Sequence, residues 1–473
     1  MPTPNTRVRS ARTALTVAAT LAAAGLAHAQ GCPPVRFVSP DGADARHYGG
    51  PVAIEPTADG HRLAIAQTGS VWVYDLVDGQ PSAGQEIVSP YPFMAFLFGC
   101  AVDLEGDRMA IGAYEVRWPG RPFHLRSVGG AAVFERNGDE WAHTGSLVAP
   151  LSVTAEAAVA NPILHGDTIF GAGGGRIVVF EQDAASPDGW SPVQVIERPD
   201  GMAYDASFGY PVVPTGDWLF VGANREDVSG VSIGGSVVVY RRQPDGRYTQ
   251  VQKIDGPDLG GYQIKLFGRS MDCDGRTLAI GSALASPDPD VEEQGAVYVL
   301  ELDGDTWTPR QTLTHRGAER RDGLGGYAIR VDGDRLVAQA SGDRTARSDN
   351  MAYLFERTGA RSWRQSARLL PTPPYHAAQY ASNLALEGDL LLVGSRDECE
   401  GPGTDTTGAA YLFDLACYEC PDLDADDRLT VFDYLEFMRA FEAGEAIADM
   451  DNDGQLTVAD FLAFQNAFAV GCP

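Results

Sequence analysis

Positive charge is scarce in this sequence. Lys and Arg together number 36 against 64 Asp and Glu, so the formal net charge at pH 7 is −28. A surface this acidic repels the phosphates of nucleic acids and the headgroups of anionic membranes. We therefore expect no nucleic acid and no anionic membrane as partners. Divalent cations, neutral glycans and basic proteins stay compatible with this charge.

Long apolar runs are lacking as well. After residue 29 no segment approaches the roughly 20 apolar residues that a membrane-spanning helix needs, so we expect no span in the mature chain. A shorter run, Ala14–Leu26, follows three arginines and precedes Ala27-His28-Ala29. This order is typical of a secretory signal peptide over residues 1–29, with an uncleaved anchor as the alternative. We predict cleavage near Ala29 and a secreted, extracellular or cell-surface protein.

Common catalytic motifs are missing too. The chain has no Gly-x-Ser-x-Gly, no His-Glu-x-x-His and no phosphate loop ending in Gly-Lys-Ser/Thr. Its eight histidines are scattered, and none pairs at the spacing of metal ligands. Carboxylates are so numerous that no pair stands out for acid–base work. We therefore assign no catalytic residue, and the sequence favours a non-enzymatic role.

Seven cysteines in an exported chain indicate disulfides. Two pairings have a rationale. A bond between Cys420 and Cys472 would close the two ends of the C-terminal segment, and a bond between Cys32 and Cys417 would join the ends of the region before it. The other pairings stay open, as do zinc or redox chemistry at Cys417-Tyr-Glu-Cys420.

One pattern recurs seven times between about residues 33 and 416, at intervals of roughly 50 residues. Each copy has a short strand, a glycine turn, an apolar strand, a variable loop, a β-branched and aromatic strand, and a tail strand. Such short runs bounded by glycine are typical of β-strands, and glycine supplies the positive φ of tight hairpins. The turn glycines are Gly60, Gly106, Gly166, Gly216, Gly275, Gly333 and Gly388.

Four strands in each of seven copies predict an all-β, seven-bladed β-propeller, because radial repetition leaves few exposed strand edges. A β-sandwich array or a ring of six blades stays an alternative. Three copies begin Phe98-Gly99, Phe208-Gly209 and Phe267-Gly268. With the Gly-Asp-x-Leu and Gly-x-Val-Tyr-Val segments that follow, they resemble FG-GAP repeats, the family of integrin α-chain heads. The calcium loop of integrin blades is replaced here by a tight turn, so blade calcium is not implied.

The C-terminal segment contains an acidic loop twice. Each copy has carboxylates at loop positions 1, 3, 5 and 12, the spacing with which a short loop wraps one Ca²⁺. Position 7 adds a backbone carbonyl, and a matching helix follows each loop. We predict about two Ca²⁺ ions in a small all-α domain, held by Asp422, Asp424, Asp426, Arg428 and Asp433 and by Asp449, Asp451, Asp453, Gln455 and Asp460.

This paired unit resembles a dockerin of the bacterial type bracketed by Cys-Pro and Gly-Cys. The resemblance covers residues 419–473 and leaves residues 30–418 to the propeller. It implies an EF-hand-like helix pair that docks on a cohesin-like receptor or another scaffold protein. Asp427 replaces the usual glycine at position 6 of the first loop, which suggests a weaker first site. Val431-Phe432 and Val458-Ala459 replace the Ser-Thr of cellulosomal dockerins, so the partner is not a standard cellulosomal cohesin.

Other side chains have a functional and a structural interpretation. Acidic residues 288–293 suit a cation or, more simply, a solvated loop. Trp118 breaks the register of the repeats and is the better candidate for a ligand contact. The recurring Trp141, Trp190, Trp307 and Trp363 indicate blade packing. An apolar stripe on the helices is expected to form core, with part of it as an alternative docking face: Phe432, Leu435, Phe441, Phe461, Leu462, Phe464 and Phe468.

Taken together, these features predict an exported, non-enzymatic adhesion or binding propeller. A calcium-dependent C-terminal module would tether it to a scaffold or cell surface. Its variable loops lie on one face, where we expect a protein or glycan ligand. A dockerin-borne glycosidase or lyase on the same propeller is the alternative, and an extracellular spacer is a third.

Overall fold

The computed structural model describes a large part of the chain. The described residues are 33–470 with gaps at 43–45, 92–97, 118–126, 150–158, 204, 229, 258–265, 343–349, 360, 371–378, 399–406, 419–422, 424–428, 445–447, 449 and 451–454. The predicted signal peptide and Trp118 therefore lie outside the described residues.

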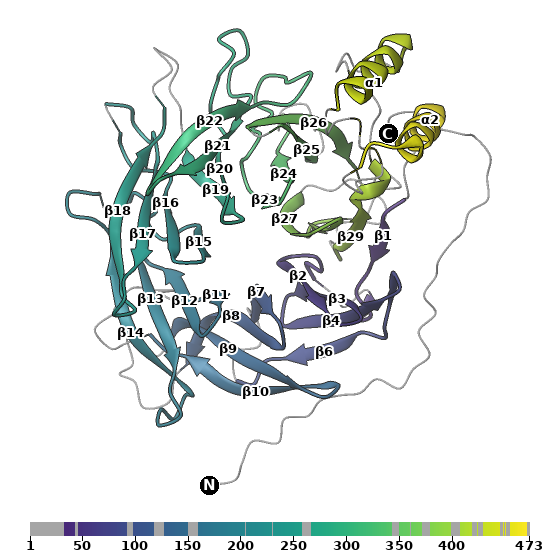
Figure 1. The fold of residues 1–473 in the computed structure, drawn as a ribbon. Helices are drawn as coiled ribbons and strands as arrows, with labels where there is room; N and C mark the ends of the chain where they lie inside the picture. The colour runs from purple at the N-terminus through teal and green to yellow at the C-terminus, as the bar shows by residue number, and fades with distance from the viewer. Residues whose placement is uncertain are drawn as a thin grey trace.

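The described strands form seven antiparallel sheets around a central axis, so the predicted seven-bladed β-propeller is confirmed (Figure 1). Blade 1 contains β2 (Val52–Thr57), β3 (Gly60–Gln67), β4 (Ser70–Val77), β5 (Gln80–Pro81) and β6 (Gln85–Val88). Blade 2 contains β7 (Phe98–Glu105), β8 (Arg108–Arg117), β9 (Ser127–Asn137) and β10 (Glu140–Leu147). Blade 3 contains β11 (Asn161–His165), β12 (Thr168–Gly173), β13 (Arg176–Gln182) and β14 (Trp190–Glu197).

Blades 4 to 6 repeat the same order of four strands. Blade 4 contains β15 (Val212–Thr215), β16 (Trp218–Ala223), β17 (Ser236–Arg242) and β18 (Tyr248–Asp255). Blade 5 contains β19 (Phe267–Cys273), β20 (Thr277–Ser282), β21 (Ala296–Asp303) and β22 (Thr306–Leu313). Blade 6 contains β23 (Ile329–Asp332), β24 (Arg335–Ala340), β25 (Met351–Gly359) and β26 (Ser362–Leu369). Blade 7 contains β27 (Tyr380–Glu387), β28 (Leu390–Ser395) and β29 (Ala409–Asp414), and its fourth strand comes from the other end of the chain.

The first strand of each blade lies nearest the axis, where it contacts the first strands of both neighbouring blades. The second and third strands are buried on both faces between neighbouring sheets, as their near-continuous apolarity predicted. All seven turn glycines have positive φ, from 53° at Gly216 to 149° at Gly60. The hairpin turns inferred from these glycines are therefore confirmed.

The ring is closed by a strand that the repeat pattern did not reveal. β1 (Val35–Phe37) pairs antiparallel with β29 and becomes the outer strand of blade 7. Arg36 donates from Nε and Nη2 to Oε1 of Glu398, at 3.1 and 2.7 Å, and the Tyr411 hydroxyl donates to Oε2 at 2.8 Å. The Glu398 side chain is only 1% exposed. A buried ion pair therefore holds together residues from the two ends of the propeller.

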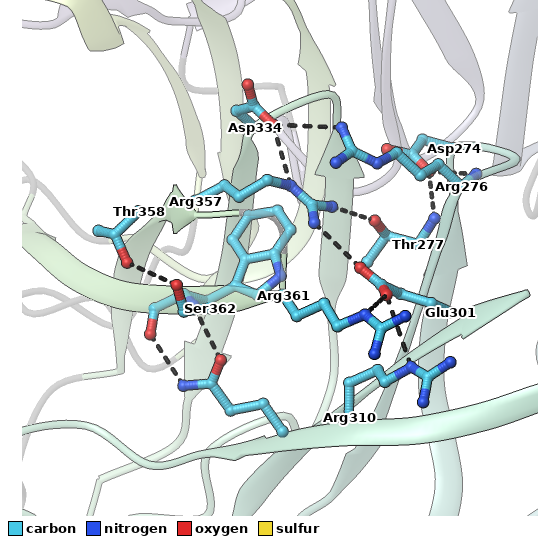
Figure 2. Close-up of polar contacts among 12 residues, drawn as sticks. Asp274, Arg276, Thr277, Glu301, Arg310, Asp334, Arg357, Thr358, Arg361 and Ser362 are labelled. Carbon is cyan, nitrogen blue, oxygen red and sulfur yellow. Dashed lines mark hydrogen bonds and ion pairs between the residues drawn. The ribbon is translucent and has the colours of Figure 1, made fainter. Parts of the chain in front are cut away.

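Arginines near the ends of third strands link blades to their predecessors. Arg357 on β25 lies 3.2 Å from Glu301 of blade 5 and 2.9 Å from Asp334 of its own blade (Figure 2). It also donates to the Thr277 hydroxyl of blade 5. The equivalent Arg136 reaches Asp75 of blade 1 at 3.0 Å. These links give the ring lateral ion pairs in addition to its apolar layers.

The recurring tryptophans lie inside this lateral packing. Trp141, Trp190, Trp307 and Trp363 are each at most 4% exposed, so the packing interpretation is confirmed. The Arg357 guanidinium, for example, lies 4.4 Å from the centre of the Trp363 ring. Such contacts suit a cation over an aromatic face.

Glutamines on the outer strands form a second repeated link. Gln311 on β22 donates to the Trp363 carbonyl at 2.9 Å and accepts from the Trp363 amide at 2.8 Å. Gln194 and Gln252 make the same paired contact with Tyr248 and Trp307 of the blades that follow them. Blades 3 to 6 are therefore joined along their outer edge by backbone hydrogen bonds to a side-chain amide.

After the last blade the structure describes a short 3₁₀-helix (Leu415–Tyr418) and two α-helices, α1 (Val431–Ala443) and α2 (Val458–Val470) (Figure 1). None of the helices among the described residues is long and apolar enough to cross a membrane. The predicted cysteine pairs involve Cys32, Cys420 and Cys472, which lie outside the described residues.

The closing ion pair gives a direct test of how the ring is held. Glu398→Gln removes one partner of a buried pair and should lower the free energy of unfolding by about 3 kcal/mol. Glu197→Gln is the matched control, because Arg176 and Glu197 form a pair whose side chains are 28% and 60% exposed. That change should cost less than about 1 kcal/mol. Equal losses in chemical denaturation would contradict a special role for Glu398.

Candidate functional site

The two helices pack on each other through aromatic side chains. Phe437 of α1 and Phe464 of α2 are fully buried and stack with their ring centres 4.3 Å apart. Leu423, Ala440 and Ala448 complete this small core. The helical segment therefore has an apolar core of its own.

Both helices begin in the same way. Asp433 accepts the Thr430 amide at 2.7 Å, and Asp460 accepts the Thr457 amide at 2.6 Å. The threonine hydroxyls accept amides of the first helical turns, so Thr430 and Thr457 act as N-caps. Asp433 and Asp460, the residues at loop position 12, are fully buried. The helix starts thus fix one carboxylate at the end of each acidic loop.

The ten predicted calcium ligands are only partly described. Asp433 and Asp460 are buried at the helix starts, and Gln455 is exposed. Asp460 also accepts the Met450 amide at 2.8 Å, which ties the start of the second loop to its end. The other seven, Asp422, Asp424, Asp426, Arg428, Asp449, Asp451 and Asp453, lie outside the described residues. Within the described ranges no group of three or more potential metal ligands comes together.

Both helices carry exposed apolar side chains. Leu435 of α1 and Leu462 of α2 are 55% and 53% exposed, and they occupy equivalent positions in the two repeats. Val431, Phe432 and Met438 of α1 and Val458 of α2 are exposed as well. We call these six residues the exposed apolar helix residues. Phe464 is core, while Phe441, Phe461 and Phe468 pack against that core. The predicted stripe therefore divides into core residues and exposed residues.

The helical segment also contacts the propeller. Arg364 on β26 donates to the carbonyl of Leu423 at 3.1 Å. Leu423 belongs to the first acidic loop and packs in the core of the helical segment. Blade 6 is therefore one point at which the ring touches the C-terminal segment.

Carboxylates on the innermost strands bind backbone amides of the next blade. Asp103 on β7 accepts the Leu164 amide at 2.7 Å, and Asp272 on β19 accepts the Val331 amide at 2.9 Å. Burial raises the pKa of Asp103 to about 6, with Glu105 adding to the rise. Burial also raises the pKa of Asp272, against the effect of Arg330. These acids have structural partners and hold the inner ring together.

The loops between second and third strands give a different result. The acidic loop at 288–293 is described, and its carboxylates do not converge. Glu292 pairs with Arg320 at 2.8 Å and Glu293 with Arg321 at 3.3 Å. The solvated interpretation of this loop is therefore the better one. Parts of two other loops between second and third strands, residues 343–349 and 399–406, lie outside the described residues.

The sequence analysis missed a buried pair formed by His315 and Asp322. His315, with a side chain only 2% exposed, lies with Nε2 at 3.1 Å from Asp322 Oδ2 and stacks on Tyr353 at 4.4 Å. Burial lowers the pKa of His315, while the Arg316 carbonyl and Asp322 oppose this effect. Spacing along an irregular segment gave no signal for the pair. Because the side chain is so deeply buried, the arrangement fits a structural contact within the connection between β22 and β23, packed against β25.

A small pocket opens beside blade 3. It has a volume of about 240 Å³ and lies between the β12–β13 hairpin turn and residues 197–202. Arg176 on its wall donates from Nε to both carboxylate oxygens of Glu197, at 2.8 and 2.7 Å. The charges of Arg176 and Glu197 therefore satisfy each other on this wall.

The raised pKa of Asp103 predicts a pH effect on stability. An acid whose pKa rises on folding stabilises the folded state most below its unfolded pKa, near pH 4, and this effect is lost as pH rises through about 6. Asp103→Asn should therefore be more stable than the wild type at pH 7, by about 3 kcal/mol, and similar to it near pH 4. Denaturation at both pH values measures this.

The exposed Asp167→Asn serves as the control for the pH experiment, because Asp167 lies in a turn at the surface. It should leave the pH dependence unchanged. If Asp103→Asn behaved like this control, Asp103 would not be the group that titrates.

Comparison with known proteins adds little beyond the fold. No protein-family model matches the chain, and no curated protein matches it in sequence. Among solved structures it is similar to a candidate 6-phosphogluconolactonase of Bacteroides uniformis, at 14% identity over 68% of this chain and 85% of that one, with a TM-score of 0.40. It is also similar to Hsv2 of Kluyveromyces lactis, at 12% identity over 72% and 89%, with a TM-score of 0.41. Similarities this weak assign no activity to the chain.

Proposed function

We propose that this protein is an exported, non-enzymatic binding propeller, tethered to an extracellular scaffold or cell surface by a calcium-dependent C-terminal module. The proposal rests on one observation, which is that α1 and α2 begin with the same arrangement of side chains. Asp433 and Asp460 are buried and oriented by their N-caps, each at the end of an acidic loop. Two equivalent carboxylates in this setting fit oxygen coordination of a hard cation.

Calcium is proposed to be held by the acidic loops themselves. The first site would use Asp422, Asp424, Asp426, Asp433 and the Arg428 carbonyl, and the second Asp449, Asp451, Asp453, Asp460 and the Gln455 carbonyl. So many carboxylates in two short loops repel one another, and a divalent ion offsets that repulsion. The ion would thereby set the position of both helices relative to each other.

The exposed apolar helix residues are proposed to dock on a cohesin-like or other scaffold protein. Exposed apolar groups in equivalent positions of two helices fit a protein interface better than a solvent-facing surface. The high negative charge of the rest of the chain disfavours a lipid surface as the partner.

The propeller is proposed to present a protein or glycan ligand site on its loops. Its blades are joined by ion pairs and by glutamine–backbone hydrogen bonds, which support a rigid scaffold. Binding residues are often carried by loops on such scaffolds. We found no cluster among the described residues that favours an enzyme.

The first test is calorimetric titration of the mature chain with Ca²⁺. About two ions should bind per chain, as expected for two oxygen-ligand loops. Asp433→Asn combined with Asp460→Asn should weaken both sites. The surface pair Asp288→Asn and Asp290→Asn removes the same charge elsewhere and should leave binding intact. A wild-type chain that binds no calcium would refute the metal part of the proposal.

The second test addresses docking. Leu435→Asp with Leu462→Asp should abolish capture of the mature chain by a panel of immobilised cohesin-like domains, and chelator should do the same to the wild type. Val193→Asp with Val251→Asp alters two exposed valines of the propeller, which are 43% and 47% exposed, and should have no effect. Capture that survives the two leucine changes would show that another surface docks.

A further inference from the structure

One position in the propeller breaks a steric rule that most blades obey. Near the end of the second strand, four blades have glycine, because the next blade packs directly against that backbone. A Cβ on Gly112 would lie 1.9 Å from the Ala160 carbonyl oxygen, and one on Gly281 would lie 2.2 Å from the Gly325 oxygen. Gly222 and Gly394 are similarly crowded by carbonyl oxygens of the blades that follow them. Blade 6 has Gln339 at this position instead.

The Gln339 side chain is fully buried, yet its amide lacks partners. Neither Nε2 nor Oε1 makes a hydrogen bond with the described protein atoms. Its backbone is satisfied, since the amide donates to Ala328 at 3.0 Å and the carbonyl accepts from Gly325 at 2.8 Å. A buried amide without partners is costly, so this group needs a hydrogen-bonding guest.

The direction of the side chain follows from strand alternation. Val337, two residues earlier on β24, packs in the apolar layer between blades 6 and 7, so Gln339 faces that layer too. Ser395 on β28 faces the same layer, because Val393 two residues earlier packs there. Ser395 is fully buried, and its hydroxyl also lacks a partner.

The two polar groups lie at the same end of this layer. Each is at or near the end of a second strand, where the variable loops begin. Ser395 pairs directly with Tyr380 on the innermost strand of blade 7. The corresponding place in other blades is where the crowded glycine meets the next blade. Blade 7 therefore packs against a glutamine side chain at a contact where other blades pack against the bare backbone of a glycine.

We infer that the junction of blades 6 and 7 contains an internal hydration site, in which the Gln339 amide and the Ser395 hydroxyl share bound water. The layer contains the apolar side chains of Leu354, Leu384 and Val393 as well as Tyr411, whose hydroxyl binds Glu398. The Gln339 amide and the Ser395 hydroxyl are both neutral, and a neutral guest avoids the cost of burying an unpaired ion between them. The amide supplies donors and an acceptor, and the hydroxyl supplies one of each. Water is the smallest neutral guest that can both donate and accept, and buried water of this kind is common in proteins.

A crystal structure of the full mature chain tests the site directly. We expect ordered water hydrogen-bonded to the Gln339 amide and within hydrogen-bonding distance of the Ser395 hydroxyl. The same water should be missing in Gln339→Leu, which keeps the side-chain size and removes both polar atoms. An amide satisfied by protein atoms alone, or one with no water beside it, would overturn the inference.

A double-mutant cycle tests whether the two groups share one guest. Gln339→Leu and Ser395→Ala should each shift the midpoint of thermal unfolding, and the double variant should shift it by less than the sum, because the water is lost only once. Ser282→Ala is the matched control, since Ser282 is the equivalent residue of blade 5. Its combination with Gln339→Leu should be additive. Additive shifts for Gln339 and Ser395 would rule out a shared site.

Discussion

Closure of the ring is the constraint on which the rest of this structure depends. A propeller is stable only if its last sheet is completed, because an open ring leaves a row of unpaired backbone groups at the edge of a strand. Here three residues of β1 supply the missing strand, and they pair with β29. The buried Glu398 fixes this pairing by binding Arg36 on one side and Tyr411 on the other.

Closure makes the other lateral contacts possible. Once the blades form a ring, each blade contacts two neighbours, and the same kinds of interaction recur between adjacent blades. Near the axis, carboxylates accept hydrogen bonds from backbone amides of the next blade. Arginines on the third strands form ion pairs with the preceding blade, and glutamines on the outer strands bond to the backbone of the following blade. Polar groups thus satisfy one another along the blades, and the junction at Gln339 is the place where we infer that water takes that role. The result suits a stiff support for variable loops.

The repeat unit could be predicted from sequence because its signals are local. Glycine at a tight turn such as Gly106 and tryptophan at a recurring position such as Trp141 each report on their own blade. The role of β1 could not be predicted, because Arg36 and Glu398 are separated by 362 residues and β1 carries no repeat signature. The same limit applies to His315 and Asp322, whose contact depends on an irregular loop path.

The C-terminal segment shows what the sequence pattern could not predict. Helical spacing identified an apolar stripe, but it did not tell which residues pair with the other helix. The structure places Phe437 and Phe464 in the core and leaves Leu435 and Leu462 exposed, because two helices can bury only their facing sides. The acidic spacing predicts calcium ligands, yet their chemistry depends on the metal itself, and that part of the site stays a prediction.

The most direct measurement is hydrogen–deuterium exchange of the full mature chain with calcium and with chelator. If a metal-set module is attached to a self-sufficient ring, calcium should slow exchange strongly over residues 419–473 and leave the propeller strands unchanged. Equal protection of residues 419–473 in chelator and in calcium would contradict the account, because the helices would then need no metal to hold their arrangement.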